Sequence, residues 1–276
     1  MANEIKITQD DRYAAGIFFY SALPLLRVIV ESEPKFAAKF KGKSFVFQVS
    51  AACEGEPGGK MATHFVIEDG VFTVKVGKAH ESPDLEFAFP DLRKFAIFFS
   101  GKGMPFPKIK GMSKLGYLIP ILMTLLRMAA LLQATDAPKK ESDKELLVKL
   151  YFYLLPNGIS RLNKMGHPEI KNFTQTSPDR AFAWSVKDKP ELNSYIRVKA
   201  GNSKAGRGVY KRCKPFLTMN FDNAQHALDI LMSKADMIEY IKKGFLFIDG
   251  APEFGAALGN LMMTVAYYAQ GQYIEG

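Results

Sequence analysis

Cysteine is scarce in this chain of 276 residues, and the two that occur, Cys53 and Cys213, lie far apart. No Cys-x-x-Cys pair is present, so the sequence predicts neither a disulfide framework nor a zinc knuckle. The first eleven residues also lack the basic start and apolar run of a secretory signal. These absences together favour the reducing cytoplasm as the location of the protein.

Catalytic motifs are missing as well. The four histidines are scattered, without a His-x-x-x-His or His-Glu-x-x-His pair, and no Gly-x-Ser-x-Gly segment occurs. We therefore expect no metal, no cofactor and no catalytic residue. The alternative is an enzyme acting on a lipid or thioester, which would assemble its site in space from residues such as His64, Glu68, Asp84 and Cys53.

Acidic side chains are outnumbered, and the formal net charge of +9 comes mostly from the second half of the chain. A basic balance is compatible with anionic membrane surfaces, phosphate-bearing ligands or nucleic acid. The basic residues are spread along the chain rather than interleaved with aromatic residues, and no nucleic-acid-binding motif occurs. We expect no nucleic-acid partner.

One long apolar run is present, from Leu115 to Leu132, and it approaches the length of a membrane span. Arg127 would cost about 2.5 to 3.5 kcal/mol near the centre of a bilayer, and Pro120 interrupts the helix. The sequence therefore favours a buried or ligand-facing helix over a membrane-spanning one.

The most informative feature is an internal duplication. Residues 109–126 align with residues 248–265 with five identities in eighteen columns, where average residue usage gives about one. Upstream, residues 83–89 align with residues 215–221 at a slightly shorter offset. A polar, proline-containing break at residues 133–143 separates the copies, which predicts two domains, 1–135 and 136–276.

Each half begins with a predicted helix and continues with strands. The helices are expected over residues 13–30 and 145–162, and both contain an aromatic trio followed closely by proline. Strands rich in aromatic and β-branched residues are expected at 44–49 and 181–186. In the first half Asp69-Gly70 joins two further strands as a hairpin. In the second half a strand at 194–199 is followed by a glycine-rich loop, so antiparallel pairing is expected in both.

A strand that feeds a helix comes next in each half. Residues 85–89 lead to Asp91, a good helix N-cap, and the helix that follows ends at Gly101. The equivalent strand at 217–221 leads to an N-cap at Asp222 or Asn223.

A short apolar segment with the pattern Ile-x-Gly then precedes the closing helix of each half. Residues 244–250 are expected to form a regular strand. Residues 104–111 contain two prolines, which allow no more than an edge strand.

This order of elements resembles the C-terminal part of the sterol carrier protein 2 family. Phe89–Gly101 resembles the strand-helix-glycine segment of that family, and Lys108–Gly111 and Phe247–Gly250 resemble its lysine-isoleucine-lysine-glycine segment. The resemblance covers about sixty residues of each half and is structural in character. It implies an α+β fold of two domains, each a mainly antiparallel sheet covered by helices around an apolar cavity. Members of the family bind sterols, fatty acids, acyl-CoA or phospholipids without covalent chemistry.

The predicted function is therefore binding and carriage of a hydrophobic ligand. An apolar ligand needs only shape and apolar surface, since about 400 Å² of buried area contributes roughly 10 kcal/mol before the cost of association. Plain core packing is the alternative role for every candidate lining residue. The candidates are Phe18, Phe19, Phe95, Phe99, Leu118 and Leu122 in the first half, and Phe152, Leu228, Leu231, Phe254, Leu258 and Met262 in the second.

The basic, glycine-rich loop at residues 200–212 is the candidate headgroup site. It lacks the Lys and Ser or Thr that a nucleotide-binding loop requires. Two interpretations remain, a solvent-exposed hairpin loop without a ligand, or contact with an anionic membrane or a CoA phosphate. The contact would be made by Lys204, Arg207, Lys211 and Arg212. A protein-interaction module whose apolar groove takes a partner helix is the other non-enzymatic alternative.

Overall fold

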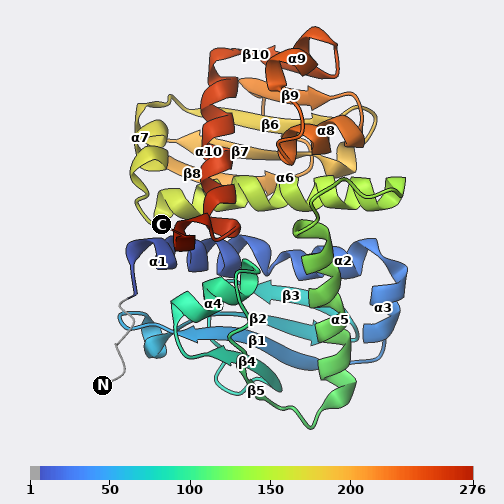
Figure 1. Ribbon diagram of the computed structural model, residues 1–276, viewed down its shortest axis with the longest axis vertical. Helices are drawn as coiled ribbons and strands as arrows, with labels where there is room; N and C mark the ends of the chain where they lie inside the picture. The colour runs from blue at the N-terminus through green and yellow to red at the C-terminus, as the bar shows by residue number, and fades with distance from the viewer. Residues whose placement is uncertain (1–6, 276) are drawn as a thin grey trace. The chain divides into compact units, whose positions relative to one another are not determined.

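The structure is a computed structural model that describes residues 7–275, so the first six residues of the N-terminal segment considered above lie outside it. Two compact units make up the chain. The first ends at Met128 but also includes the segment from Tyr267 onward, and the second is Ala129–Ala266. Each unit is an α+β domain with one five-stranded sheet, as Figure 1 shows.

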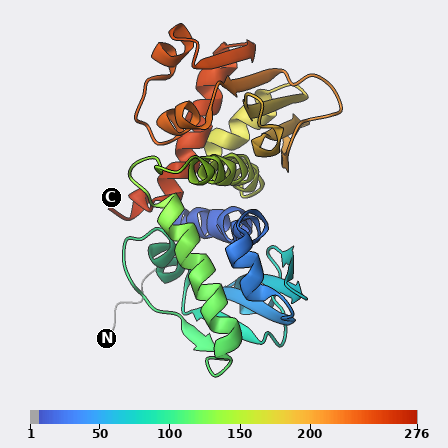
Figure 2. The same cartoon turned by 90° about the vertical axis from the view of Figure 1, so that its right-hand side faces the viewer.

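The first unit is built around strands β1 to β5. Its elements in chain order are α1 (Gln9–Ile17), a π-helical turn (Phe18–Ala22), α2 (Leu25–Ser32), α3 (Pro34–Phe40), β1 (Phe45–Ala52), β2 (Lys60–Glu68), β3 (Val71–Lys75), β4 (Leu85–Phe89), α4 (Leu92–Phe99), β5 (Lys108–Lys110) and α5 (Leu115–Leu132), of which residues up to Met128 belong here. Figures 1 and 2 show α4 and α5 on one face of this sheet.

The second unit is built around strands β6 to β10. Its elements are α6 (Glu141–Lys164), α7 (Pro168–Thr176), β6 (Arg180–Val186), β7 (Ser194–Lys199), β8 (Asn202–Arg207), β9 (Leu217–Phe221), α8 (Ala224–Leu231), α9 (Met237–Lys242), β10 (Leu246–Gly250) and α10 (Glu253–Ala269), of which residues up to Ala266 belong here.

The two sheets have the same topology. Their strand orders are β3-β2-β1-β4-β5 and β8-β7-β6-β9-β10. In each sheet the central strand pairs in parallel with the strand that feeds a helix, β1 with β4 and β6 with β9, and the other neighbours are antiparallel. The expectation of mainly antiparallel sheets covered by helices is confirmed.

The alternation of side chains along each central strand explains which face the helices cover. Phe45, Phe47, Val49 and Ala51 alternate on β1 and are buried. Phe182, on the equivalent strand β6, contacts Phe254 of α10 with ring centroids 6.1 Å apart. The apolar face of each sheet therefore packs against the helices of its own unit.

Several predicted local signals form as expected. The hairpin between β2 and β3 turns at Asp69 and Gly70, both with positive φ. The Asp91 side chain accepts a hydrogen bond from Lys94 N at 2.7 Å and caps α4, and Asn223 caps α8 in the same way. The segment with two prolines contributes only β5, a three-residue strand at the edge of its sheet.

The glycine of the Ile-x-Gly pattern has the same role in both units. Gly111 and Gly250 both have positive φ, and a Cβ atom at either position would clash with a backbone carbonyl oxygen. The oxygens belong to Asp84 and Phe216, each just before the neighbouring strand, β4 or β9. Only glycine allows the chain to pass so close to that strand.

One local expectation needs correction. The glycine-rich segment of the second half is a strand, β8, that turns from β7 at Ala200 and Gly201. The Tyr195 ring lies across Gly206, where a side chain would collide with it, so this glycine serves strand packing rather than loop flexibility. Both aromatic trios lie in helical segments, as expected. The first lies in the π-helical turn, and the second lies in α6, which continues through Pro156.

Candidate functional site

Four of the predicted lining residues meet in one aromatic cluster of the first unit. Phe19 stacks on Phe95 at 4.1 Å between ring centroids, and Phe18 contacts both Phe95 and Phe99. Phe89 of β4 completes the cluster against the sheet. Phe18, Phe19 and Phe95 are buried and Phe99 is partly exposed, so the cluster reaches the surface at one edge.

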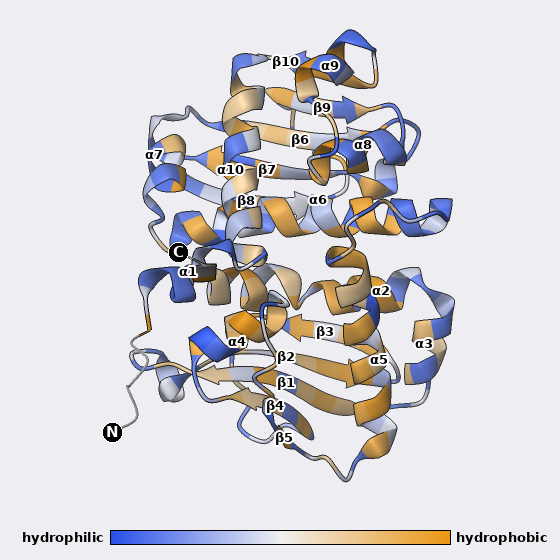
Figure 3. Ribbon diagram, in the orientation of Figure 1, coloured by the Kyte–Doolittle hydropathy of each residue, from blue (hydrophilic) through white to orange (hydrophobic). Residues whose placement is uncertain are grey.

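Helix α5 has an unusual distribution of apolar side chains. Leu118, Ile121 and Met128 are buried, and Arg127 forms two hydrogen bonds to the carboxylate of Glu33 on the first unit. The opposite side of the helix is also apolar but faces solvent, with Leu115, Ile119, Leu122, Met123 and Leu126 between 37% and 68% exposed. Figure 3 shows this helix as largely hydrophobic. A helix that is apolar all round is normally buried.

The surface continues into the segment before α5. Met104, Phe106 and Met112 are more than half exposed. An open depression of about 280 Å³ lies at the start of the helix, lined by Lys114, Gly116 and Tyr117. We call the exposed side chains of Met104, Phe106, Met112 and the five exposed α5 residues the α5 surface.

The predicted lining residues of the second unit are mostly interior. Phe152, Leu228 and Leu258 are buried, and Phe254 packs against Phe182 and Phe216 beneath α10. Leu231 and Met262 are partly exposed.

The four predicted headgroup residues are all exposed, but they do not form one cluster. Lys204 and Arg207 lie an odd number of positions apart on β8, so their side chains leave opposite faces of the sheet. The Arg207 guanidinium lies over the Tyr153 ring of α6 at 4.5 Å. Lys211 and Arg212 follow in the segment between β8 and β9.

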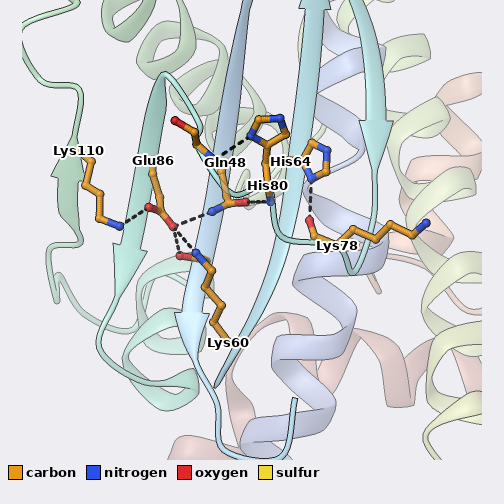
Figure 4. Close-up of polar contacts among 9 residues, drawn as sticks. Gln48, Lys60, His64, Lys78, His80, Glu86 and Lys110 are labelled. Carbon is orange, nitrogen blue, oxygen red and sulfur yellow. Dashed lines mark hydrogen bonds and ion pairs between the residues drawn. The ribbon is translucent and has the colours of Figure 1, made fainter. Parts of the chain in front are cut away.

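A polar network crosses the opposite face of the first sheet, as Figure 4 shows. Glu86 on β4 is 1% exposed. Its carboxylate accepts hydrogen bonds from Gln48 at 2.7 Å, Ser50 at 2.7 Å and Lys110 at 2.6 Å, and Lys60 lies 3.3 Å away. Burial opposes ionisation, but these donors outweigh it and lower the pKa of Glu86 to about 2.

Two histidines, His64 and His80, lie next to this network and are protonated at different ring nitrogens. His64 Nδ1 lies 2.7 Å from the carbonyl oxygen of Lys78, so this nitrogen carries the proton. His80 Nδ1 accepts from the backbone N–H of Ser82. The rings lie 5.3 Å apart, and burial lowers the pKa of His64.

The fold itself does not require this network. Matching the parallel pair Phe47–Leu85 with Phe182–Leu217 aligns the two sheets. Thr218 then takes the place of Glu86, and Ala183 takes the place of Gln48. The network is thus particular to the first unit.

The residues named for an enzymatic alternative make separate contacts. Cys53 Sγ accepts a hydrogen bond from Arg12 at 3.3 Å, whereas His64 contacts Lys78 and His80. Asp84 pairs with Lys114, whose ammonium lowers the pKa of that carboxyl. Within residues 7–275, no group of three or more His, Cys, Asp or Glu side chains is arranged to hold a metal ion.

Sequence reasoning missed two polar groups in the second unit. Trp184 Nε1 on β6 and Ser194 Oγ on β7 are buried and have no hydrogen-bond partner among the described residues. Trp184 is the single tryptophan of the chain. This was the one sequence signal that could have pointed to these two polar groups.

Two stretches of the described chain are long and apolar enough to cross a membrane, Gln9–Ser32 and Leu115–Leu132. The first is mostly buried, as core helices are, whereas only a third of the second is buried.

The sequence matches no known protein family and no curated protein. Among solved structures, the chain is similar to a conserved hypothetical protein from Thermus thermophilus for which a sterol carrier role has been suggested. The identity is 14%, the TM-score is 0.29, and the match covers 45% of this chain and 84% of that one. It is also similar to a stereoselective inverting sec-alkylsulfatase from Pseudomonas sp., with 14% identity, a TM-score of 0.27, and coverage of 55% and 28%. Both TM-scores are low, so no function is carried over from either protein.

Proposed function

We propose that this protein binds and carries a hydrophobic ligand of the lipid class without catalysing a reaction on it. The observation that carries the proposal is the α5 surface, because eight large apolar side chains of one continuous segment remain exposed. Monomeric proteins rarely leave such a patch on the surface unless it contacts a ligand, partner or membrane.

The aromatic cluster provides a second support. Phe18, Phe19, Phe95 and Phe99 converge between helices and sheet. Aromatic side chains offer large apolar areas to a ligand that enters beside them. The repeated sheet topology and the matching roles of Gly111 and Gly250 support the further proposal that the units are tandem copies of one sterol carrier protein 2-like module.

The experiment is lipid analysis of the purified chain followed by titration of delipidated protein with fluorescent fatty acid and sterol probes. We expect co-purified lipid and saturable binding. Replacing Leu115, Ile119 and Leu126 together by Gln should weaken binding about tenfold, since exposed apolar contact area is removed.

The matched control replaces Ile238 and Phe247 by Gln, because these second-unit side chains are 63% and 65% exposed. The control should bind as the original chain does. Absence of lipid together with absence of probe binding would contradict the proposal, and a co-purified protein in place of lipid would favour the interaction-module alternative.

A further inference from the structure

Trp184 and Ser194, whose buried polar atoms have no hydrogen-bond partner among the described residues, are neighbours. Trp184 and Ser194 lie directly opposite each other in the antiparallel pairing of β6 and β7. Side chains in such a pair project from the same face and their Cβ atoms lie about 4.5 to 5.5 Å apart. Each is only 1% exposed.

Both side chains face the helix-covered interior of the second unit. Trp184 lies two residues after Phe182 and therefore shares its face. Phe182 contacts Phe173, Phe216 and Phe254, which all belong to this unit. An indole N–H and a hydroxyl are thus buried in an apolar interior without an acceptor. Burying such groups without a hydrogen-bond partner lowers the stability of the fold.

The first unit provides an internal comparison. The aligned sheets place Val49 at the position of Trp184 and Thr63 at the position of Ser194. Thr63 Oγ1 donates to the carbonyl oxygen of Phe19 at 2.8 Å, within the π-helical turn. The same position is therefore satisfied in one unit and unsatisfied in the other.

A positively charged side chain, Arg207, lies next to Ser194 on the neighbouring strand β8. Arg207 of β8 lies directly opposite Ser194, so its side chain starts from the same face, and its guanidinium lies over Tyr153 at the exposed edge. From the central strand β6 to the edge strand β8, the three side chains provide an indole N–H at Trp184, a hydroxyl at Ser194 and a positive charge at Arg207.

We infer that Trp184, Ser194 and Arg207 form a subsite for the carboxylate of a long-chain fatty acid in the second unit. A carboxylate accepts several hydrogen bonds at once, and its charge requires a nearby cation when it leaves water. An uncharged alcohol of the same chain length would use the two inner donors but gain nothing from Arg207. The inference rests on the proposed function, because it takes a lipid as the ligand. It places the carboxylate of that ligand in the second unit rather than at the α5 surface.

The test uses Trp184 as an intrinsic probe, since it is the single tryptophan. Delipidated protein is titrated with oleic acid and, as a matched control, with oleyl alcohol, and tryptophan emission is followed. We expect saturable change with oleic acid and affinity roughly tenfold weaker for the alcohol, the usual difference that one charge-assisted hydrogen bond makes.

Two variants separate this subsite from ordinary packing. Ser194→Ala should weaken oleic acid binding about fivefold while leaving the urea midpoint of the ligand-free protein unchanged or higher, because an unsatisfied hydroxyl is removed. Arg207→Gln should abolish the preference for acid over alcohol. Trp184→Phe, followed by native mass spectrometry, checks the indole N–H in the same way.

The inference is overturned if Ser194→Ala lowers the midpoint without changing affinity, or if acid and alcohol bind equally. Oleic acid bound without any Trp184 response also overturns it and leaves the proposed function standing. No lipid binding by any method overturns both.

Discussion

Gly111 and Gly250 show how single residues set the packing of both sheets. Their positive φ and the nearby carbonyl oxygens of Asp84 and Phe216 leave no room for a side chain. We expect Gly111→Ala or Gly250→Ala to lower the free energy of unfolding by at least about 1 to 3 kcal/mol, the cost of a strained backbone position. Urea denaturation measures this value.

The control is Gly116→Ala, at a helical position where a Cβ would meet nothing within 4 Å. It should leave stability equal or slightly higher, because alanine is the better helix former. Equal stability of all three variants would show that the Ile-x-Gly glycines are dispensable.

The lowered pKa of Glu86 predicts how the stability of the fold depends on pH. Its folded pKa of about 2 is below the ordinary value of 4.5, so its contribution to stability is present above that ordinary value and is lost as the pH falls through 2. This contribution is on the order of 2 kcal/mol, given its burial and its partly exposed lysine partners.

Glu86→Gln should therefore be less stable than the original chain at pH 7, and the difference should shrink between pH 5 and about pH 2. Chemical unfolding at each pH in that range measures the difference. A constant difference down to pH 2 would mean that the carboxylate is not held ionised by its donors.

At the scale of elements, the α5 surface predicts contact with a membrane. Residues 92–135 contain seven basic and no acidic residues, although several of these basic side chains pair with acids elsewhere in the fold. Lys108 of β5 is exposed. Exposed apolar side chains next to lysines are the combination that anionic lipid surfaces attract.

Vesicle flotation tests this prediction. The chain should bind phosphatidylcholine vesicles containing about 30% phosphatidylserine more strongly than neutral vesicles, and less strongly as salt rises. The Leu115, Ile119 and Leu126 triple replacement by Gln should lose most of this binding. Unchanged binding by that variant would assign the contact to other residues, such as the predicted headgroup group at Lys204 to Arg212.

The elements show where sequence reasoning succeeds. Hairpins, caps and strand-helix units were predictable because Asp69-Gly70, Asp91 and Asn223 act through local backbone chemistry. Strand β8 was missed because Gly206 depends on the Tyr195 ring, a contact from the neighbouring strand. The π-helical turn was missed because its identity depends on tertiary packing, including the hydrogen bond from Thr63.

The candidate site was predictable only in part. Apolar spacing identified Phe18, Phe19, Phe95 and Phe99, which meet in one cluster. It could not separate the packed side of α5 from the exposed side, because both are apolar. Nor could it identify Trp184 and Ser194 as a pair, since their adjacency arises from strand register.

At the scale of the whole molecule, two units of the same topology carry different side chains at matching positions. The first has the Glu86 network and the exposed α5 surface, and the second has the unsatisfied Trp184 and Ser194. We therefore expect the two units to differ in ligand contact, with the membrane-facing surface in the first and the acid-binding interior in the second.

The measurement that tests lipid binding most directly is photo-crosslinking with a photoactivatable fatty acid, followed by peptide mass spectrometry. The account predicts crosslinks in the α5 segment and in the peptides that contain Trp184 or Ser194, and excess oleic acid should suppress them. Crosslinks that excess oleic acid does not suppress, or none above background, would contradict the claim that this protein binds a lipid.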